Sequence, residues 1–160
     1  MTYQSQIFYT NERFLPWLTY MVNGEIGWAG GYRGHPLPFF KNFYAGGTGS
    51  VRGFETATLG PRDTNGDVLG GNRRFVLNFE QLFPLPGYKE KNVRLATFLD
   101  AGYVWGEGEK MKFSDLRSSV GLAISWDSPV GPLRFSFAQP IKQVSTDKVE
   151  RFQFQLGKIF

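Results

Sequence analysis

The chain has 160 residues, enough for one domain with a sizeable core, and its formal net charge at pH 7 is +4. The absence of cysteine excludes disulfide frameworks, thiolate metal sites and cysteine nucleophiles, and no run of Lys and Arg marks a groove for nucleic acid. No window approaches the roughly 18 apolar residues that a transmembrane helix needs, and the first ten residues lack the regions of a secretory signal. We therefore expect either a cytosolic protein or a piece of a longer one with an added start residue.

Seven segments alternate apolar and polar residues with a period of two, which predicts β-strands with one apolar and one polar face. The predicted strands are Tyr3–Phe14, Leu18–Trp28, Arg73–Gln81, Val93–Trp105, Leu116–Trp126, Leu133–Gln139 and Glu150–Phe160. No segment predicts a helix. The sequence therefore predicts an all-β, antiparallel fold that forms a single segment over residues 1–160, with a long inserted loop at residues 33–71.

Alternation alone fits a soluble β-sandwich binding module, with its apolar faces packed inside. Two features favour a transmembrane β-barrel. The polar faces are rich in Gly, Ser and Ala, which suits a crowded or water-filled lumen. Aromatic residues also gather at the strand ends, as in the interfacial girdles of outer-membrane barrels: Trp17, Trp28, Trp105, Trp126 and Phe160.

The connections between predicted strands alternate between short turns and longer polar loops, as they do in bacterial outer-membrane barrels. By this parity the C-terminus faces the periplasm. Because bacterial barrels normally have an even number of strands, seven strands predict a portion of a larger barrel with two open edges. Those edges would have to pair with further strands or with a second copy of the chain, since unpaired backbone groups are costly in lipid.

The long loop contains a Gly-rich run, NFYAGGTGSVRGF, at Asn42–Phe54. Glycine lets the backbone approach a wall closely, so the tip Val51-Arg52-Gly53-Phe54 is predicted to place one guanidinium in a confined position. Glu80 and Asp100 fall on the polar faces of consecutive strands, where antiparallel neighbours can present both carboxylates to that guanidinium. The alternative is that Arg52 is a solvated loop residue.

Several segments resemble those of the Omp85 superfamily, in the same order and over nearly the whole chain. Asn42–Phe54 resembles the conserved loop six of the family, and Val51–Phe54 matches its VRGF motif. The further similar segments are the aromatic-x-D-x-G strand motif at Phe98–Gly102, the C-terminal hairpin at Ser128–Leu133 with Ala138–Pro140, and the final strand at Phe152–Lys158.

This resemblance implies the last seven of sixteen strands of an outer-membrane protein assembly factor, which folds and inserts β-barrel proteins into the bacterial outer membrane. It implies that loop six folds into the barrel and that Arg52 meets Glu80 and Asp100 on the inner wall. The implied partners are client outer-membrane proteins, accessory lipoproteins, the lipid bilayer, and the N-terminal strands and periplasmic POTRA domains of the same protein; nucleic acid is not among them.

The resemblance also implies that the final strand pairs weakly with the first barrel strand and forms a lateral gate. Gly157 lies where a kink would help that opening, and Phe160 matches the C-terminal signal of outer-membrane proteins. Other members of the family share the VRGF motif, so a TamA-like assembly factor or a two-partner secretion transporter stays an alternative.

The sequence gives little support for an enzymatic function, because HExxH, GxSxG and P-loop motifs are all missing. The single histidine, His35, precedes a proline in turn-forming sequence. Asp63, Asn65 and Asp67 hint at a calcium loop but lack the glutamate that completes it. We therefore predict a protein without catalytic residues, cofactor or metal site.

Overall fold

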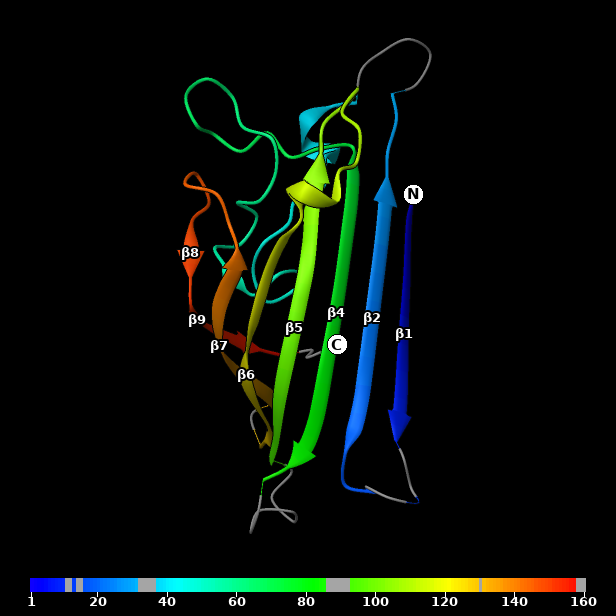
Figure 1. Ribbon diagram of the computed structural model, residues 1–160, viewed down its shortest axis with the longest axis vertical. Helices are drawn as coiled ribbons and strands as arrows, with labels where there is room; N and C mark the ends of the chain where they lie inside the picture. The colour runs from blue at the N-terminus through cyan, green and yellow to red at the C-terminus, as the bar shows by residue number, and fades with distance from the viewer. Residues whose placement is uncertain (11–12, 14–15, 32–36, 86–92, 130, 158–160) are drawn as a thin grey trace.

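The computed structural model describes residues 1–10, 13, 16–31, 37–85, 93–129 and 131–157. One curved antiparallel sheet of seven strands, in the order β1-β2-β4-β5-β6-β7-β9, dominates the fold (Figure 1). Its strands are β1 (Thr2–Thr10), β2 (Thr19–Trp28), β4 (Arg73–Pro84), β5 (Val93–Trp105), β6 (Arg117–Ser128), β7 (Gly131–Lys142) and β9 (Phe152–Leu156). Two short strands, β3 (Gly53–Phe54) and β8 (Val149–Glu150), pair separately, and two 3₁₀ turns cover Phe39–Lys41 and Phe113–Asp115. Within these described ranges no helix has the length and apolar character to cross a bilayer.

The predicted all-β fold and its seven antiparallel strands are confirmed. Several strand boundaries differ from the prediction; β4 and β7, for example, extend to Pro84 and Lys142. The first strand ends at Thr10, and the last begins at Phe152 because Glu150 pairs instead with Gly53 in the short β3–β8 ladder. The predicted positions His35 and Phe160 lie outside the described residues.

Each long strand pairs with the next long strand along the chain, which makes the sheet a simple meander. The β4–β5 ladder is continuous from Arg73↔Trp105 to Pro84↔Arg94. The β6–β7 ladder has one irregularity, at Ser118/Ser119. Because neighbouring strands are antiparallel, the connections alternate between the two ends of the sheet. The register with β7, in which Leu156 pairs with Leu133, makes β9 run toward the end opposite the long loop.

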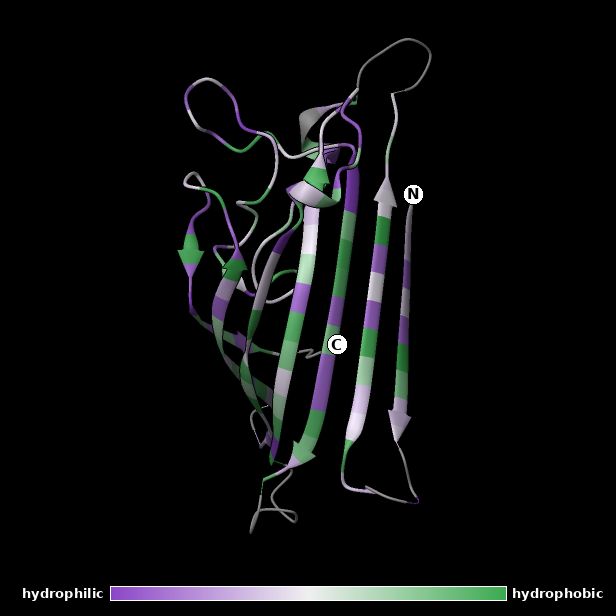
Figure 2. Cartoon of the chain, in the orientation of Figure 1, coloured by the Kyte–Doolittle hydropathy of each residue, from purple (hydrophilic) through white to green (hydrophobic). Residues whose placement is uncertain are grey.

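The two faces of the sheet differ as the alternation predicts, and Figure 2 shows this as alternating bands along the strands. Large apolar side chains are exposed on the convex face, and they include Ile26, Leu77, Leu99, Leu122, Phe137 and Phe154. No second layer of described residues covers this face, so the structure does not support the β-sandwich alternative. An exposed apolar face on the convex side of a curved sheet is what the lipid-facing wall of a barrel requires.

The core lies on the concave face, where the described part of the long loop (residues 37–71) packs against the wall (Figure 1). Ala45, Val51, Phe54 and Leu59 of the loop form a buried cluster with Val104 of β5. A second buried cluster lines the wall itself and consists of Met21, Leu82, Ala96, Phe98, Ala123 and Ala138. The fold therefore buries the tip of a loop inside the curve of the sheet.

Candidate functional site

The tip of the long loop, Val51–Phe54, takes a shape that only glycine allows at its turns. Gly46, Gly47 and Gly53 have φ of 106°, 90° and 89°, in the left-handed region. A Cβ at Gly46 would lie 2.4 Å from the carbonyl oxygen of Glu55, and one at Gly53 would lie 3.0 Å from Cβ of Ala138. The Gly-rich sequence is therefore what lets the tip fold tightly and touch β7.

Small residues on the wall make the matching space. A Cβ at Gly102 of β5 would lie 2.9 Å from Cγ2 of Val51, so this glycine accommodates the tip directly. A Cβ at Gly121 of β6 would lie 2.4 Å from Cζ of Phe98, so this one accommodates the ring on which the tip rests. The small residues that the alternation placed on the polar face thus form the seat of the loop.

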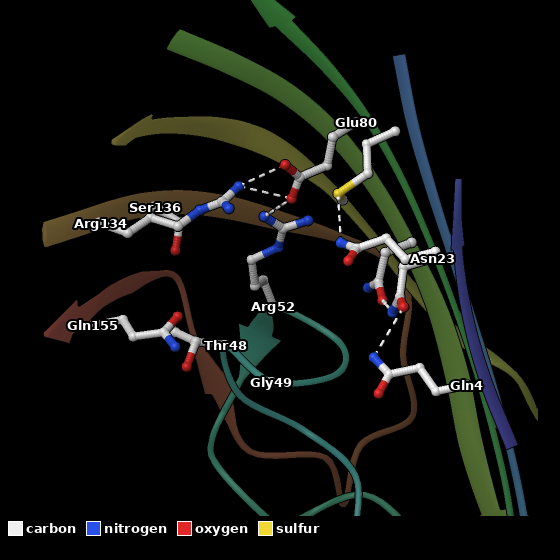
Figure 3. Close-up of a pocket in the computed structure, with 12 residues that line it drawn as sticks. Gln4, Asn23, Thr48, Gly49, Arg52, Glu80, Arg134, Ser136 and Gln155 are labelled. Carbon is white, nitrogen blue, oxygen red and sulfur yellow. Dashed lines mark hydrogen bonds and ion pairs between the residues drawn. The ribbon is translucent and has the colours of Figure 1, made fainter. Parts of the chain in front are cut away.

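Arg52 is held by two carboxylates on neighbouring strands, and its residue is only 4% exposed. Its Nε and Nη2 donate to Oδ2 and Oδ1 of Asp100 at 2.7 Å each, a bidentate pair. Its Nη1 lies 2.5 Å from Oε1 of Glu80, and Figure 3 shows these two side chains pointing toward each other. The structure thus brings together Arg52, Glu80 and Asp100, and the solvated-arginine alternative is wrong.

Further groups fix the same guanidinium and its main partner. The backbone N–H of Arg52 donates to Oδ2 of Asp100 at 3.0 Å, and Nδ2 of Asn78 donates to Oδ1 at 2.9 Å and to the carbonyl of Ser50 at 2.6 Å. The Cζ atom of Arg52 lies 3.5 Å from the ring centroid of Phe98, a cation–π contact. The carboxylate of Asp100, which is completely buried, therefore keeps hydrogen-bond partners for both oxygens.

A second arginine balances the charge. Nη2 of Arg134, on β7, donates to both oxygens of Glu80 at 2.7 and 2.8 Å. Two buried guanidinium groups thus face two buried carboxylates, which offsets the large cost of taking each charge out of water. Burial on its own lowers the pKa of the Arg52 guanidinium, but the hydrogen bonds and charges of Asp100 and then Glu80 raise that pKa above its ordinary value.

A row of side-chain amides extends the site toward the edge of the sheet. Nδ2 of Asn23 donates to Oδ1 of Asn78 at 2.9 Å, and Nε2 of Gln4 donates to Oδ1 of Asn23 at 3.0 Å. Strands β1, β2 and β4 are thereby linked through side chains across the concave face (Figure 3), and the hydrogen bond from Asn78 to Asp100 adds β5. Among the described residues no group of three or more His, Cys, Asp or Glu side chains is placed to hold a metal ion. Arg52, Glu80, Asp100 and Arg134, which we call the clamp, thus fasten the tip of the long loop to the sheet.

Comparison with known proteins shows the family of this chain. The model of the Omp85 superfamily domain matches residues 2–160. The chain belongs to the Omp85 superfamily. Its sequence is 44% identical to the outer membrane protein assembly factor BamA of Neisseria meningitidis, over 89% of this chain and 22% of that protein. It is 33% identical to BamA of Nitratidesulfovibrio vulgaris, over 78% of this chain and 16% of that protein.

More distant relatives and a solved structure agree. The sorting assembly machinery 50 kDa subunit of Saccharomyces cerevisiae is 26% identical over 94% of this chain and 33% of that protein. The crystal structure of BamA from Haemophilus ducreyi lacking POTRA domains 1–3 matches with a TM-score of 0.81 at 30% identity, over 96% of this chain and 34% of that chain. The seven-stranded sheet is therefore a portion of an Omp85 β-barrel, and the chain spans about a fifth of the length of the Neisseria relative.

The assignment of the long loop to loop six of the family, with Val51–Phe54 as its VRGF motif, stays a prediction, and on that basis we call the long loop loop six. Gly157 directly follows β9 with φ of 101°, and its N–H donates to the carbonyl of Pro132 at 2.9 Å. This left-handed conformation favours glycine at the position, and the kink that would help the strand to open stays a prediction. The assignment of the end of β9 to a lateral gate stays a prediction, and Phe160 lies beyond the described range.

Sequence reasoning missed the roles of several residues in and around the clamp. The sequence predicted no partner for Arg134, Asn78 or Phe98. It also predicted none for Gln153 of β9, whose side chain reaches loop six. The inward position of an arginine on β7 was the one available signal, because a cation facing a crowded lumen needs an anion.

Proposed function

We propose that this chain is the C-terminal part of a BamA-type assembly factor that folds and inserts β-barrel proteins into the bacterial outer membrane. The observation that carries the proposal is the 44% identity to Neisseria meningitidis BamA over 89% of the chain. Because the match spans only 22% of that protein, we propose that further barrel strands and periplasmic POTRA domains accompany these residues. The described strands are then the last seven of sixteen.

The exposed edges and faces support this placement. Strands β1 and β9 each have a single neighbour in the sheet, so each presents a row of free backbone groups to a further strand. In the proposed protein the convex apolar face lies in lipid and the C-terminus faces the periplasm, because β9 runs toward the end with the short connections.

The proposed mechanism needs no enzyme chemistry. A weakly paired seam beside β9 offers strand edges to which a client strand adds by backbone hydrogen bonding. The barrel also thins the bilayer locally, which helps the client to insert. Arg52, Glu80 and Asp100 hold loop six in the lumen and stabilise the wall next to that seam. Client outer-membrane proteins and accessory lipoproteins are the proposed partners, and no cofactor, metal or ATP takes part.

The test is a folding assay in vesicles. The full-length protein carrying residues 1–160 is reconstituted in lipid vesicles, and a urea-unfolded small outer-membrane barrel is added. Folding is followed by the faster gel migration of the folded barrel without heating. We expect folding several times faster than in empty vesicles. An unchanged rate, or uptake of a secreted soluble passenger without barrel insertion, would overturn the proposal and favour a two-partner secretion transporter.

A further inference from the structure

The tip of loop six is bonded on two opposite sides, and only one of them is the arginine clamp. On the other side, Nε2 of Gln153 in β9 donates to the carbonyl of Phe54 at 2.8 Å. The N–H of Gly53 makes a longer contact of 3.4 Å to Oε1 of the same amide. Gln153 lies 99 residues from Phe54 in sequence and is 5% exposed, so one buried side chain serves both backbone groups.

A short ladder reinforces this connection. Gly53 and Phe54 pair with Glu150 and Val149 as the β3–β8 ribbon, and the N–H of Glu55 donates to the carbonyl of Lys148 at 2.9 Å. Residues 148–150 lead directly into β9. The tip therefore reaches β4 and β5 through the side chain of Arg52, and β9 through its own backbone.

The other attachments of strand β9 are mainly to β7, whose Phe135 packs against Phe152 and Phe154. It pairs with β7 over Phe152–Leu156 and has no second neighbour among the described strands. Phe152, Phe154 and Leu156 point to the convex face and are 51–62% exposed. On the concave face, the buried anchor of this strand is Gln153. A short edge strand with one ladder is marginal by itself, so a buried side-chain anchor contributes a large share of its retention.

We propose that Gln153 is a positioning residue that couples loop six to the final strand. The tip of loop six then acts as a brace across the concave face, fastened to β4 and β5 at one end and to β9 at the other. Loosening either end loosens the other, so the docking of loop six sets how readily β9 leaves the sheet. The inference goes beyond the proposed assembly role and involves no client protein.

The experiment is hydrogen exchange measured by mass spectrometry on the full-length protein in lipid nanodiscs. Gln153→Leu keeps the approximate size of the side chain and removes its amide contacts with Phe54, Gly53 and Glu150. The matched control is Gln139→Leu on β7, because the Gln139 amide donates only to the carbonyl of the next residue, Pro140, at 3.3 Å. We expect Gln153→Leu to speed exchange about tenfold at residues 53–55 and in β9, with β2 unchanged, and Gln139→Leu to change neither.

A reciprocal measurement tests the coupling between loop six and β9 in a variant that keeps Gln153. Arg52→Ala should speed exchange in β9 by about tenfold, although Arg52 makes its ion pairs with β4 and β5. Exchange in β9 within twofold of wild type in Arg52→Ala would overturn the proposal, even if Gln153→Leu failed to fold. Unchanged exchange at residues 53–55 in a folded Gln153→Leu protein would overturn it as well. Client folding is not measured, so neither failure bears on the assembly role.

Discussion

Replacing Arg52 by alanine removes the whole guanidinium from the buried clamp, and the structure allows the cost to be worked out. Glu80 keeps its two hydrogen bonds from Arg134, so its charge stays compensated. Asp100 keeps the backbone N–H of residue 52 and the amide of Asn78, but it loses its only cation while remaining completely buried. The damage is therefore concentrated on Asp100.

Removing one partner of a buried ion pair typically costs about 3–5 kcal/mol. The stacking of the guanidinium on Phe98 adds about 0.5–2 kcal/mol to what is lost. Because Glu80 remains paired, we take the lower figure of about 3 kcal/mol for the free energy that docks loop six. At about 1.4 kcal/mol per factor of ten, this corresponds to roughly a hundredfold rise in the undocked population.

The assay is hydrogen exchange and limited proteolysis of residues 42–71 in the membrane-embedded protein. The control is Lys148→Ala, which removes the cation of the Lys148–Glu55 pair. That pair spans 3.7 Å, with side chains 61% and 50% exposed, so its loss should cost no more than about 1 kcal/mol. Arg52→Ala should expose loop six to protease at a temperature at which wild type and Lys148→Ala resist. Wild-type resistance in Arg52→Ala would refute the reasoning.

Two further predictions concern the seat of the loop and the turn after β7. Gly102→Ala brings a methyl group within 2.9 Å of Val51 and should lower the free energy of unfolding by about 1–3 kcal/mol through overpacking. The control is Gly24→Ala, whose added methyl group has no atom within 4 Å and should leave the denaturation midpoint unchanged. Equal midpoints for the two variants would contradict the prediction. Asp147→Asn weakens the ion pair with Arg117, in which Nε lies 2.5 Å from Oδ2, so proteolysis of residues 143–148 should accelerate about tenfold. An unchanged rate of proteolysis would show that this ion pair does not hold the turn.

The strands of this fold were predictable because a barrel wall imposes a strict period of two on the sequence. Most inward positions of β4 to β7 carry polar or small residues, with Val76, Leu82, Phe98 and Val104 as buried apolar exceptions. Most outward positions carry apolar residues, so the faces of Glu80 and Asp100 followed from counting alone. The ends of the last strand were less predictable. Glu150 satisfies the same alternation, but it pairs with loop six, a contact that no local pattern encodes.

The clamp was predictable only in part. A Gly-rich run ending in arginine, two inward carboxylates and the family resemblance were enough to place Arg52 between Glu80 and Asp100. The roles of Arg134 and Gln153 were not accessible, because they depend on how the sheet curves and on where the long loop lies within that curve. Their partners are 54 and 99 residues away in sequence, so only the folded chain brings them together.

The measurement that tests the account most directly is the coupling free energy between Arg52 and Asp100. A double-mutant cycle of Arg52→Ala and Asp100→Ala, read as the docking free energy of loop six, isolates this pair from the rest of the site. We predict that the double variant is less destabilised than the sum of the single variants by about 2 kcal/mol or more, because the buried positive and negative charges are unequal in number only in the single variants. Additive effects would contradict the claim that this bond holds loop six against the barrel wall.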